Sequence, residues 1–181
     1  MNAVRVDLMA SAVEKIGGVT WHHLFLLAVD ASGKGQYLRG GPQCLPVERL
    51  AGRMTQYGDA IEDYEPSPAG PYGVITISSG AYEPGGVDSD PVAANGTLAS
   101  GNAAAQLWNN VQNAAKALAE EQIPYDPIGK GANWGIMEAL RRCGVKAPLP
   151  AKRWAPGASA ITADPVLQEV STRRLGHAVV L

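Results

Sequence analysis

The sequence lacks several features that assign a protein to a class of function. Its 181 residues include only two cysteines, and no apolar stretch approaches the roughly 20 residues of a membrane-spanning helix. Basic and acidic residues are balanced, at 15 and 17, and no long basic run occurs, so we expect no nucleic-acid partner. One disulfide would be weak evidence in a chain of this size, so we expect Cys44 and Cys143 to be reduced.

Motifs for metal and phosphate binding are missing as well. No spacing of His, Cys, Asp and Glu matches a zinc site, and Asp88-Ser89-Asp90 is too short for an EF-hand loop. Gly33-Lys34-Gly35 lacks the surrounding pattern of a phosphate loop. We therefore expect no metal and no cofactor. The first residues also lack the basic start and apolar centre of a signal peptide, which predicts that any export uses a dedicated secretion system.

What is present is typical of a globular chain. Hydrophobic residues make up 46% and charged residues 18%, and no internal repeat or linker divides the sequence. We expect one domain over residues 1–181, long enough for a sizeable core. The 21 glycines and 13 prolines predict many turns and a loop-rich surface.

Hydrophobic periodicity predicts two helices in the second half of the chain. The first begins at an N-cap on Ser100 and ends before Pro124, with apolar residues spaced along one side. The second spans residues 132–143 and ends at Gly144.

Strands are expected where β-branched and apolar residues gather between turns. Residues 19–29 and 36–39 flank a turn and predict a hairpin, and residues 72–78 predict a further strand. The remaining expectations are a helix over residues 8–16, a loop over residues 83–96 and a closing strand over residues 176–181. Together these elements predict an α+β fold, an antiparallel sheet with helices packed on it.

One helix start has the setting of a cysteine nucleophile without the cysteine. The N-terminus of a helix favours a thiolate, because free N–H groups and the positive end of the dipole lie there. The loop over residues 125–131 leads to such a start, where the residue is Ala132. A cysteine hydrolase also needs an imidazole and a polar group that orients it. His23, at the start of an apolar strand, is the candidate imidazole, although both features also occur in proteins without catalytic function.

Four segments together resemble a bacterial family of circularly permuted, papain-like proteins related to the NlpC-type cell-wall peptidases. They are residues 23–27 (HLFLL), 37–42 (YLRGGP), 123–129 (IPYDPIG) and 142–144 (RCG). Members of the family carry a His-apolar-Phe strand, an Arg-Gly-Gly-Pro turn and a helix opened by Asn-Ser-Asn-Ser or a Cys variant. Permutation puts the histidine before the nucleophile, and the order here agrees.

The resemblance spans roughly residues 19–145 and implies a papain-like version of the α+β fold. It places Ala132 at the nucleophile position and Asn133 at the next family position, whereas Gly131 and Trp134 depart from the pattern. The alanine is either a replaced cysteine or serine or a natural alanine. The implied mechanism uses His23 as the base and the backbone around Asn133 as the oxyanion site.

Other polar residues near these motifs are alternatives. Strand alternation puts His22 and His23 on opposite faces, and the family pattern selects His23. Gln36 and Tyr37, on the neighbouring strand, are candidates for the orienting group, and Arg39 is a candidate for binding a substrate carboxylate or for holding the glycine turn.

Two further side chains compete for catalytic roles. His177 lies in a segment similar to the Gly-His strand of unpermuted enzymes, and it is a competing base or a third polar group. Cys44 is an alternative nucleophile that lacks a helix start, whereas Cys143 lies at a helix C-terminus, where the dipole opposes a thiolate.

The resemblance implies a function in addition to a site. It predicts amide hydrolysis, with peptidoglycan peptides as the substrate, by an interbacterial toxin of the kind delivered by type VI secretion and neutralised by a cognate immunity protein. A related permuted group acts on lipid esters, so lipid hydrolase or acyltransferase activity is an alternative. The third hypothesis is a non-catalytic module that binds a peptide, a glycan or a protein partner.

Overall fold

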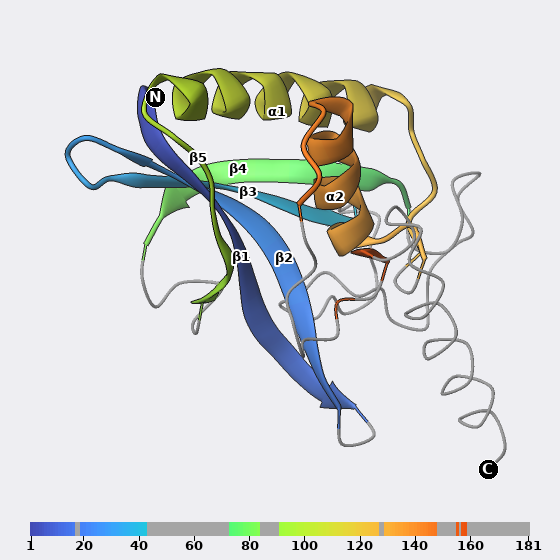
Figure 1. The fold of residues 1–181 in the computed structure, drawn as a ribbon. Coiled ribbons are helices and arrows are strands. Elements are labelled where there is room, and N and C mark those ends of the chain that lie inside the picture. Colours follow the sequence, from blue (N-terminus) through green and yellow to red (C-terminus); the bar gives the residue numbers. More distant parts are fainter. Residues whose placement is uncertain are drawn as a thin grey trace, which may run out of the picture.

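Five antiparallel strands form one sheet, and two helices pack on one of its faces (Figure 1). The computed structural model describes residues 1–16, 19–42, 73–83, 91–126, 129–147, 155 and 157–158. The order of the strands in the sheet is β4-β3-β2-β1-β5. The elements are β1 (Ala3–Ile16), β2 (Val19–Asp30), β3 (Gly35–Pro42), β4 (Ile75–Tyr82), β5 (Pro91–Ser100), α1 (Asn102–Glu120) and α2 (Ala132–Arg142). The predicted α+β class, an antiparallel sheet with packed helices, is confirmed.

Strand β1 corrects the expected helix over residues 8–16. It pairs with β2 from Ala3↔Asp30 to Ile16↔Val19. Leu8 and Ala10 are buried on one face of the strand and Met9 on the other. A strand that is buried on both faces loses the alternation of apolar and polar residues, and its apolar positions then imitate helical spacing.

The other predicted strands are present with shifted limits. Residues 19–29 and 36–39 lie within β2 and β3, and the strand expected over residues 72–78 begins at Ile75. The loop expected over residues 83–96 is wrong in its second part, because β5 begins at Pro91. Few residues of β5 favour a strand, and its hydrogen bonds with β1 outweigh this local preference. The predicted strand over residues 176–181 lies outside the described residues.

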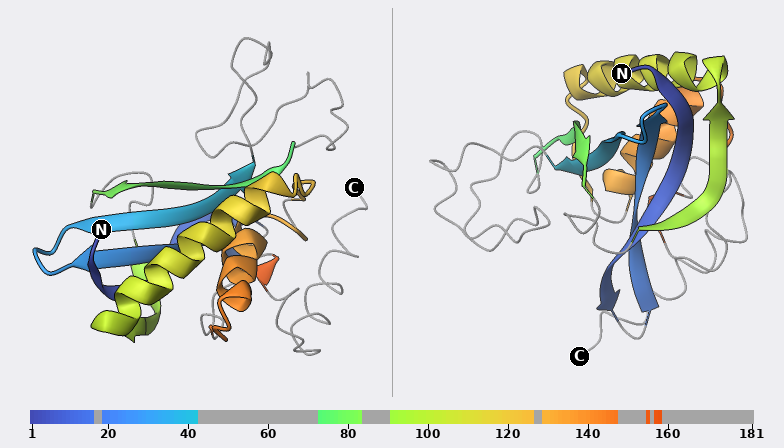
Figure 2. Two further views of the ribbon diagram at one scale, coloured as in Figure 1. Left: turned by 90° about the horizontal axis from the view of Figure 1, so that it is seen from above. Right: turned by 90° about the vertical axis from the view of Figure 1, so that its left-hand side faces the viewer.

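Both predicted helices are present. The N-cap of α1 is Gly101, one residue after the expected Ser100, and the Gly101 N–H donates to the Val4 carbonyl of β1. Gly144 ends α2 with a φ of 74°, a conformation that favours glycine. Figure 2 shows α1 crossing the strands with α2 beside it.

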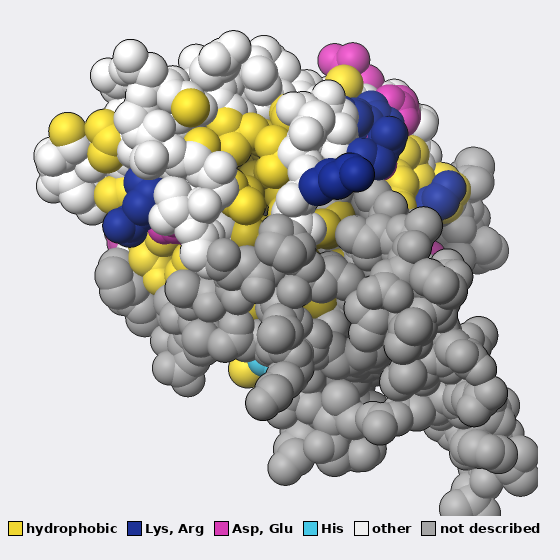
Figure 3. Space-filling view, in the orientation of Figure 1, with side chains coloured by type: hydrophobic (Ala, Val, Ile, Leu, Met, Phe, Trp, Pro, Cys, Tyr) yellow, Lys and Arg dark blue, Asp and Glu magenta, His cyan; other side chains and the backbone are white. Residues whose placement is uncertain are grey.

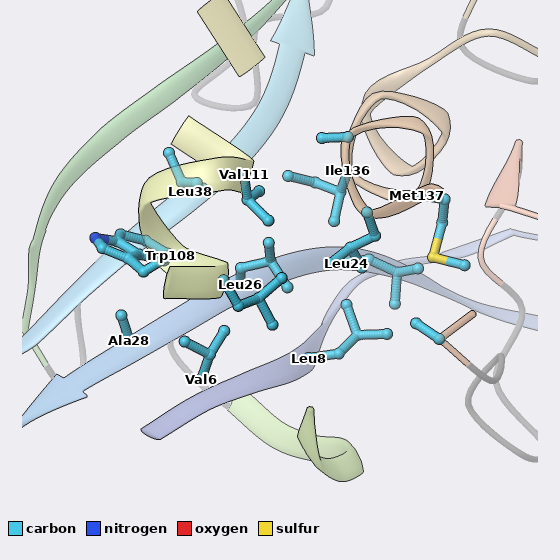
Figure 4. Close-up of a cluster of buried hydrophobic side chains, with 14 of the residues drawn as sticks. Val6, Leu8, Leu24, Leu26, Ala28, Leu38, Trp108, Val111, Ile136 and Met137 are labelled. Carbon is cyan, nitrogen blue, oxygen red and sulfur yellow. The ribbon is translucent and has the colours of Figure 1, made fainter. Parts of the chain in front are cut away.

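The sheet has two faces with separate clusters of apolar side chains. On the helix face, Leu24, Leu26 and Leu38 pack with the buried side chains of both helices (Figure 4). On the second face, Phe25 packs with Met9 and Leu27, and with residues on β3 and β4. Successive residues of β2 therefore alternate between two buried layers, as side chains do along any strand.

Charged side chains join the C-terminal ends of the two helices, where Figure 3 shows basic and acidic side chains together. Glu138 is buried and accepts hydrogen bonds from Arg141 and Arg142. These guanidinium groups hold the pKa of Glu138 below its usual range. Arg142 also pairs with Glu121 at the end of α1. This network holds the C-terminal end of α2 against the C-terminal end of α1.

Strands β2 and β3 separate beneath the first turn of α2. Their pairing ends at Phe25↔Arg39, although β3 continues to Pro42 (Figure 1). A Cβ atom on Gly40 would lie 2.2 Å from the carbonyl oxygen of Ala132. The helix therefore begins directly on the backbone of Gly40, a contact that only glycine permits.

This contact predicts that Gly40→Ala destabilises the protein. The added methyl group cannot be accommodated without moving α2, and overpacking of this kind costs about 1–3 kcal/mol. Gly41→Ala is the matched control, because a Cβ there meets no atom within 4 Å. Its effect should stay within about 0.5 kcal/mol. Urea unfolding measures both, and equal stability of the two variants would contradict the packing of α2 on Gly40.

Candidate functional site

The Asn133 side chain takes the place of a β3 residue beside β2. Its Oδ1 accepts a hydrogen bond of 2.7 Å from the Leu24 N–H, and its Nδ2 donates one of 3.0 Å to the His22 carbonyl. If the ladder had continued past Phe25↔Arg39, Gly40 would lie opposite Leu24. Asn133, which is 3% exposed, instead satisfies these two backbone groups.

These hydrogen bonds give the side chain of Asn133 a structural role, whereas the oxyanion site predicted for the backbone around Asn133 stays a prediction. The side-chain amide of Asn133 is committed to the backbone of β2, as a peptide group would be in a sheet. Its contribution is therefore to position the start of α2. The predicted start of α2 is confirmed, but the hydrogen bonds of Asn133 to a distant strand leave no local signal in the residues around it.

The methyl group of Ala132 belongs to an apolar cluster of the helix layer. Ala132 is 4% exposed and clusters with Ile75 of β4 and with Tyr125, which precedes the helix. Alanine supplies no nucleophile, and burial of an introduced thiol among these apolar groups would raise its pKa. At position 132 this burial acts against the formation of a thiolate and opposes the effect of the helix start.

His23 lies on the other side of the sheet from Ala132. It alternates with Leu24, whose side chain is on the helix face, and so shares the second face with Phe25. Its Nδ1 is 2.7 Å from a guanidinium nitrogen of Arg39, the residue opposite Phe25 on β3. The structure therefore does not assemble the expected pair of Ala132 and His23. The histidine on the helix face is His22, which the family pattern had set aside.

The contact with Arg39 defines the chemistry of His23. A guanidinium group only donates hydrogen bonds, so the Nδ1 atom of His23 accepts. The neutral ring then carries its proton on Nε2, which makes that atom a hydrogen-bond donor. Together, Arg39 and His23 form a group of donors suited to an anion rather than to the removal of a proton.

The remaining site candidates lie elsewhere or outside the described residues. Gln36 and Tyr37 are opposite Ala28 and Leu27. These positions are five and four residues along β2 from His23, a distance of about 17 and 13 Å, so neither side chain orients that ring. Arg39 contacts the ring instead, a residue that the sequence had indicated for binding a substrate carboxylate or for holding the glycine turn. The competing candidates His177 and Cys44 lie outside the described residues.

Other sites are not apparent in the described part of the chain. Burial raises the pKa of the Cys143 thiol, which fits a small apolar role. No group of three or more His, Cys, Asp or Glu side chains is arranged to hold a metal ion in these segments. Neither described helix is both long and apolar enough to span a membrane.

Comparison with known proteins gives no match. No family model, no curated protein and no solved structure matches this chain. The resemblance to permuted papain-like proteins stays a prediction, and the functional argument depends on the geometry described above.

The bridge made by Asn133 predicts a pH-dependent effect of Asn133→Asp. Burial raises the pKa of the introduced carboxyl above its ordinary value of about 3.9. When it is neutral, this carboxyl donates to the His22 carbonyl, whereas the carboxylate places an acceptor against that acceptor. The variant should lose about 2–3 kcal/mol of stability at neutral pH, and this loss should shrink as the pH falls through the raised pKa.

The control for this experiment is Asn110→Asp, which changes an exposed residue of α1. Urea unfolding at neutral and acidic pH measures both variants. A deficit in Asn133→Asp that stays constant with pH, or no deficit at all, would contradict the bridge.

Proposed function

We propose that this chain is a non-catalytic binding module that holds a carboxylate-bearing peptide through Arg39 and His23. The observation that carries the proposal is the 2.7 Å contact between these side chains, on the sheet face opposite α2. It gives the pair a role that needs no nucleophile at position 132.

The neighbours of the pair on the second face are polar residues. Ser11 is opposite His23, and Ser78 is opposite Arg39, so a row of polar residues crosses four strands on the second face. The cluster around Phe25 adjoins this row on the same face, but Phe25, Met9 and Leu27 are buried and offer no surface to a ligand. Arginine and histidine donors recognise a carboxylate, so the polar row carries the proposed binding.

The state of position 132 supports binding rather than catalysis. Ala132 is buried against Ile75 and Tyr125, and the predicted base is on the other face. The resemblance to papain-like hydrolases predicts a helix start beside a histidine-bearing strand, and α2 begins beside β2, which carries His22 and His23. In this proposal the chain retains that junction for structure and has lost acyl transfer.

A hydrolase remains the second candidate because of His22. This residue lies on the helix face, and Asn133 holds its carbonyl beside the first turn of α2. With cysteine or serine at position 132, His22 would be the base for cleavage of a peptidoglycan amide or a lipid ester. An interbacterial toxin with an immunity partner belongs to this candidate.

The binding proposal predicts discrimination between a carboxylate and an amide. A short peptide with a free C-terminal carboxylate, such as acetyl-Lys-D-Ala-D-Ala, should bind, and its C-terminal amide should bind at least 10-fold more weakly. Arg39→Gln should weaken binding of the free acid by about 10–100-fold, since hydrogen bonds to charged groups contribute about 1.5–3 kcal/mol.

The control for this prediction is Arg5→Gln, which removes an exposed arginine of β1 that pairs with Asp7. Isothermal titration calorimetry measures each affinity. Equal binding of acid and amide, or no binding by the wild type, would refute the proposed site.

The two candidates differ in what Ala132→Cys would do. As a binding module, the variant should react with iodoacetamide no faster than a free cysteine, because its surroundings are apolar. His22→Ala should not change that rate. Both measurements use a background in which Cys44 and Cys143 are serine.

Rapid alkylation that His22→Ala abolishes would support the hydrolase instead. Expression of Ala132→Cys in the bacterial periplasm adds a second readout. Lysis there, lost with His22→Ala, would overturn the non-catalytic proposal.

A further inference from the structure

The outer edge of β4 carries a row of backbone groups that pair with no strand in the described part of the chain. Among the described elements, β4 is the last strand of the sheet on its side. The Ile75 N–H donates outward to Ile123, and the Tyr125 N–H donates to Gly73. Beyond Ile75, no described segment pairs with this edge.

The direction of these hydrogen bonds fixes which residues face outward. Backbone groups alternate in direction along a strand, so the N–H and carbonyl groups of Ile77, Ser79 and Ala81 point the same way as those of Ile75. Ser79 and Ala81 are exposed, and Ile77 is half-buried. The open edge is therefore five residues long and has Ser79 at its centre.

We infer that this edge pairs with the same edge of a second copy of the chain, antiparallel and centred on Ser79. In this register, Ser79 of the two copies exchange two hydrogen bonds, and Ile77 of each copy exchanges two with Ala81 of the other. Since a two-fold axis passes through the centre, both copies use the same surface, as in most dimers of identical chains.

The composition of the edge favours a second copy over other occupants. Residues 77–81 contain no charge and no proline, the usual devices that prevent edges from pairing, and their side chains apart from Ile77 are small. An uncharged edge meets its own copy without repulsion. Residues 123–125, which pair with Gly73 and Ile75, end the open edge on one side. In the symmetric dimer, the same segment of the second copy ends it on the other side.

A contact of five residues per copy is small. It falls below the roughly 1,200 Å² of buried surface that stable complexes exceed, so the dimer should be weak and depend on concentration. Sedimentation equilibrium of the full chain from micromolar to millimolar concentration should show a shift from monomer to dimer mass.

A charge swap at Ser79 tests the register. Ser79→Lys and Ser79→Glu should each be monomeric over this range, because like charges would lie directly opposite each other. An equimolar mixture of the two should recover the dimer, since the charges are then opposite. Ser79→Gln is the neutral control and should dimerise as the wild type does. Circular dichroism checks that each variant is folded.

Each other result overturns the inference. A wild type that stays monomeric at every concentration excludes the second copy. If Ser79→Lys and Ser79→Glu each dimerise on their own as strongly as Ser79→Gln does, pairing at Ser79 is excluded. If the mixture of the two charged variants contains only monomers, the two-fold register is excluded.

Discussion

The hydrogen bonds between Asn133 and β2 determine how the helix layer meets the sheet. They satisfy the Leu24 N–H and the His22 carbonyl where β3 has moved away. Leaving a buried backbone group without a partner costs about 1–3 kcal/mol, so the separation of β2 and β3 depends on this amide. Gly40 completes the arrangement because its missing side chain admits the first turn of α2.

The alternation of side chains along β2 then separates two kinds of chemistry. Position 132 is enclosed with Ile75 and Tyr125 in the helix layer. His23 is directed to the second face, where Arg39 contacts it. A helix start and a histidine strand are thus adjacent in the fold, with His23 and position 132 on opposite faces of the sheet, and the role we propose for the donors of the second face is to bind an anion.

Local patterns predicted much of the fold and less of the site. Both helices, the hairpin of β2 and β3, and the end of α2 at Gly144 follow from periodicity and turn residues. β5 did not, because its pairing with the distant strand β1 overrides its local preference. β1 did not, because burial on both faces gave it apolar positions that imitate helical spacing. Alternation correctly separated His22 from His23, but the face that α2 covers depends on tertiary packing. The role of Asn133 depends on a partner more than a hundred residues away.

A scalar coupling across the hydrogen bond tests the central claim most directly. In a protein labelled with ¹⁵N and ¹³C, nuclear magnetic resonance detects coupling between a donor nitrogen and the carbon of its acceptor group. The structure predicts a coupling from the Leu24 nitrogen to the side-chain Cγ of Asn133. A coupling from Leu24 to the backbone carbonyl carbon of Gly40 instead would show that β2 and β3 stay paired, and it would contradict the account.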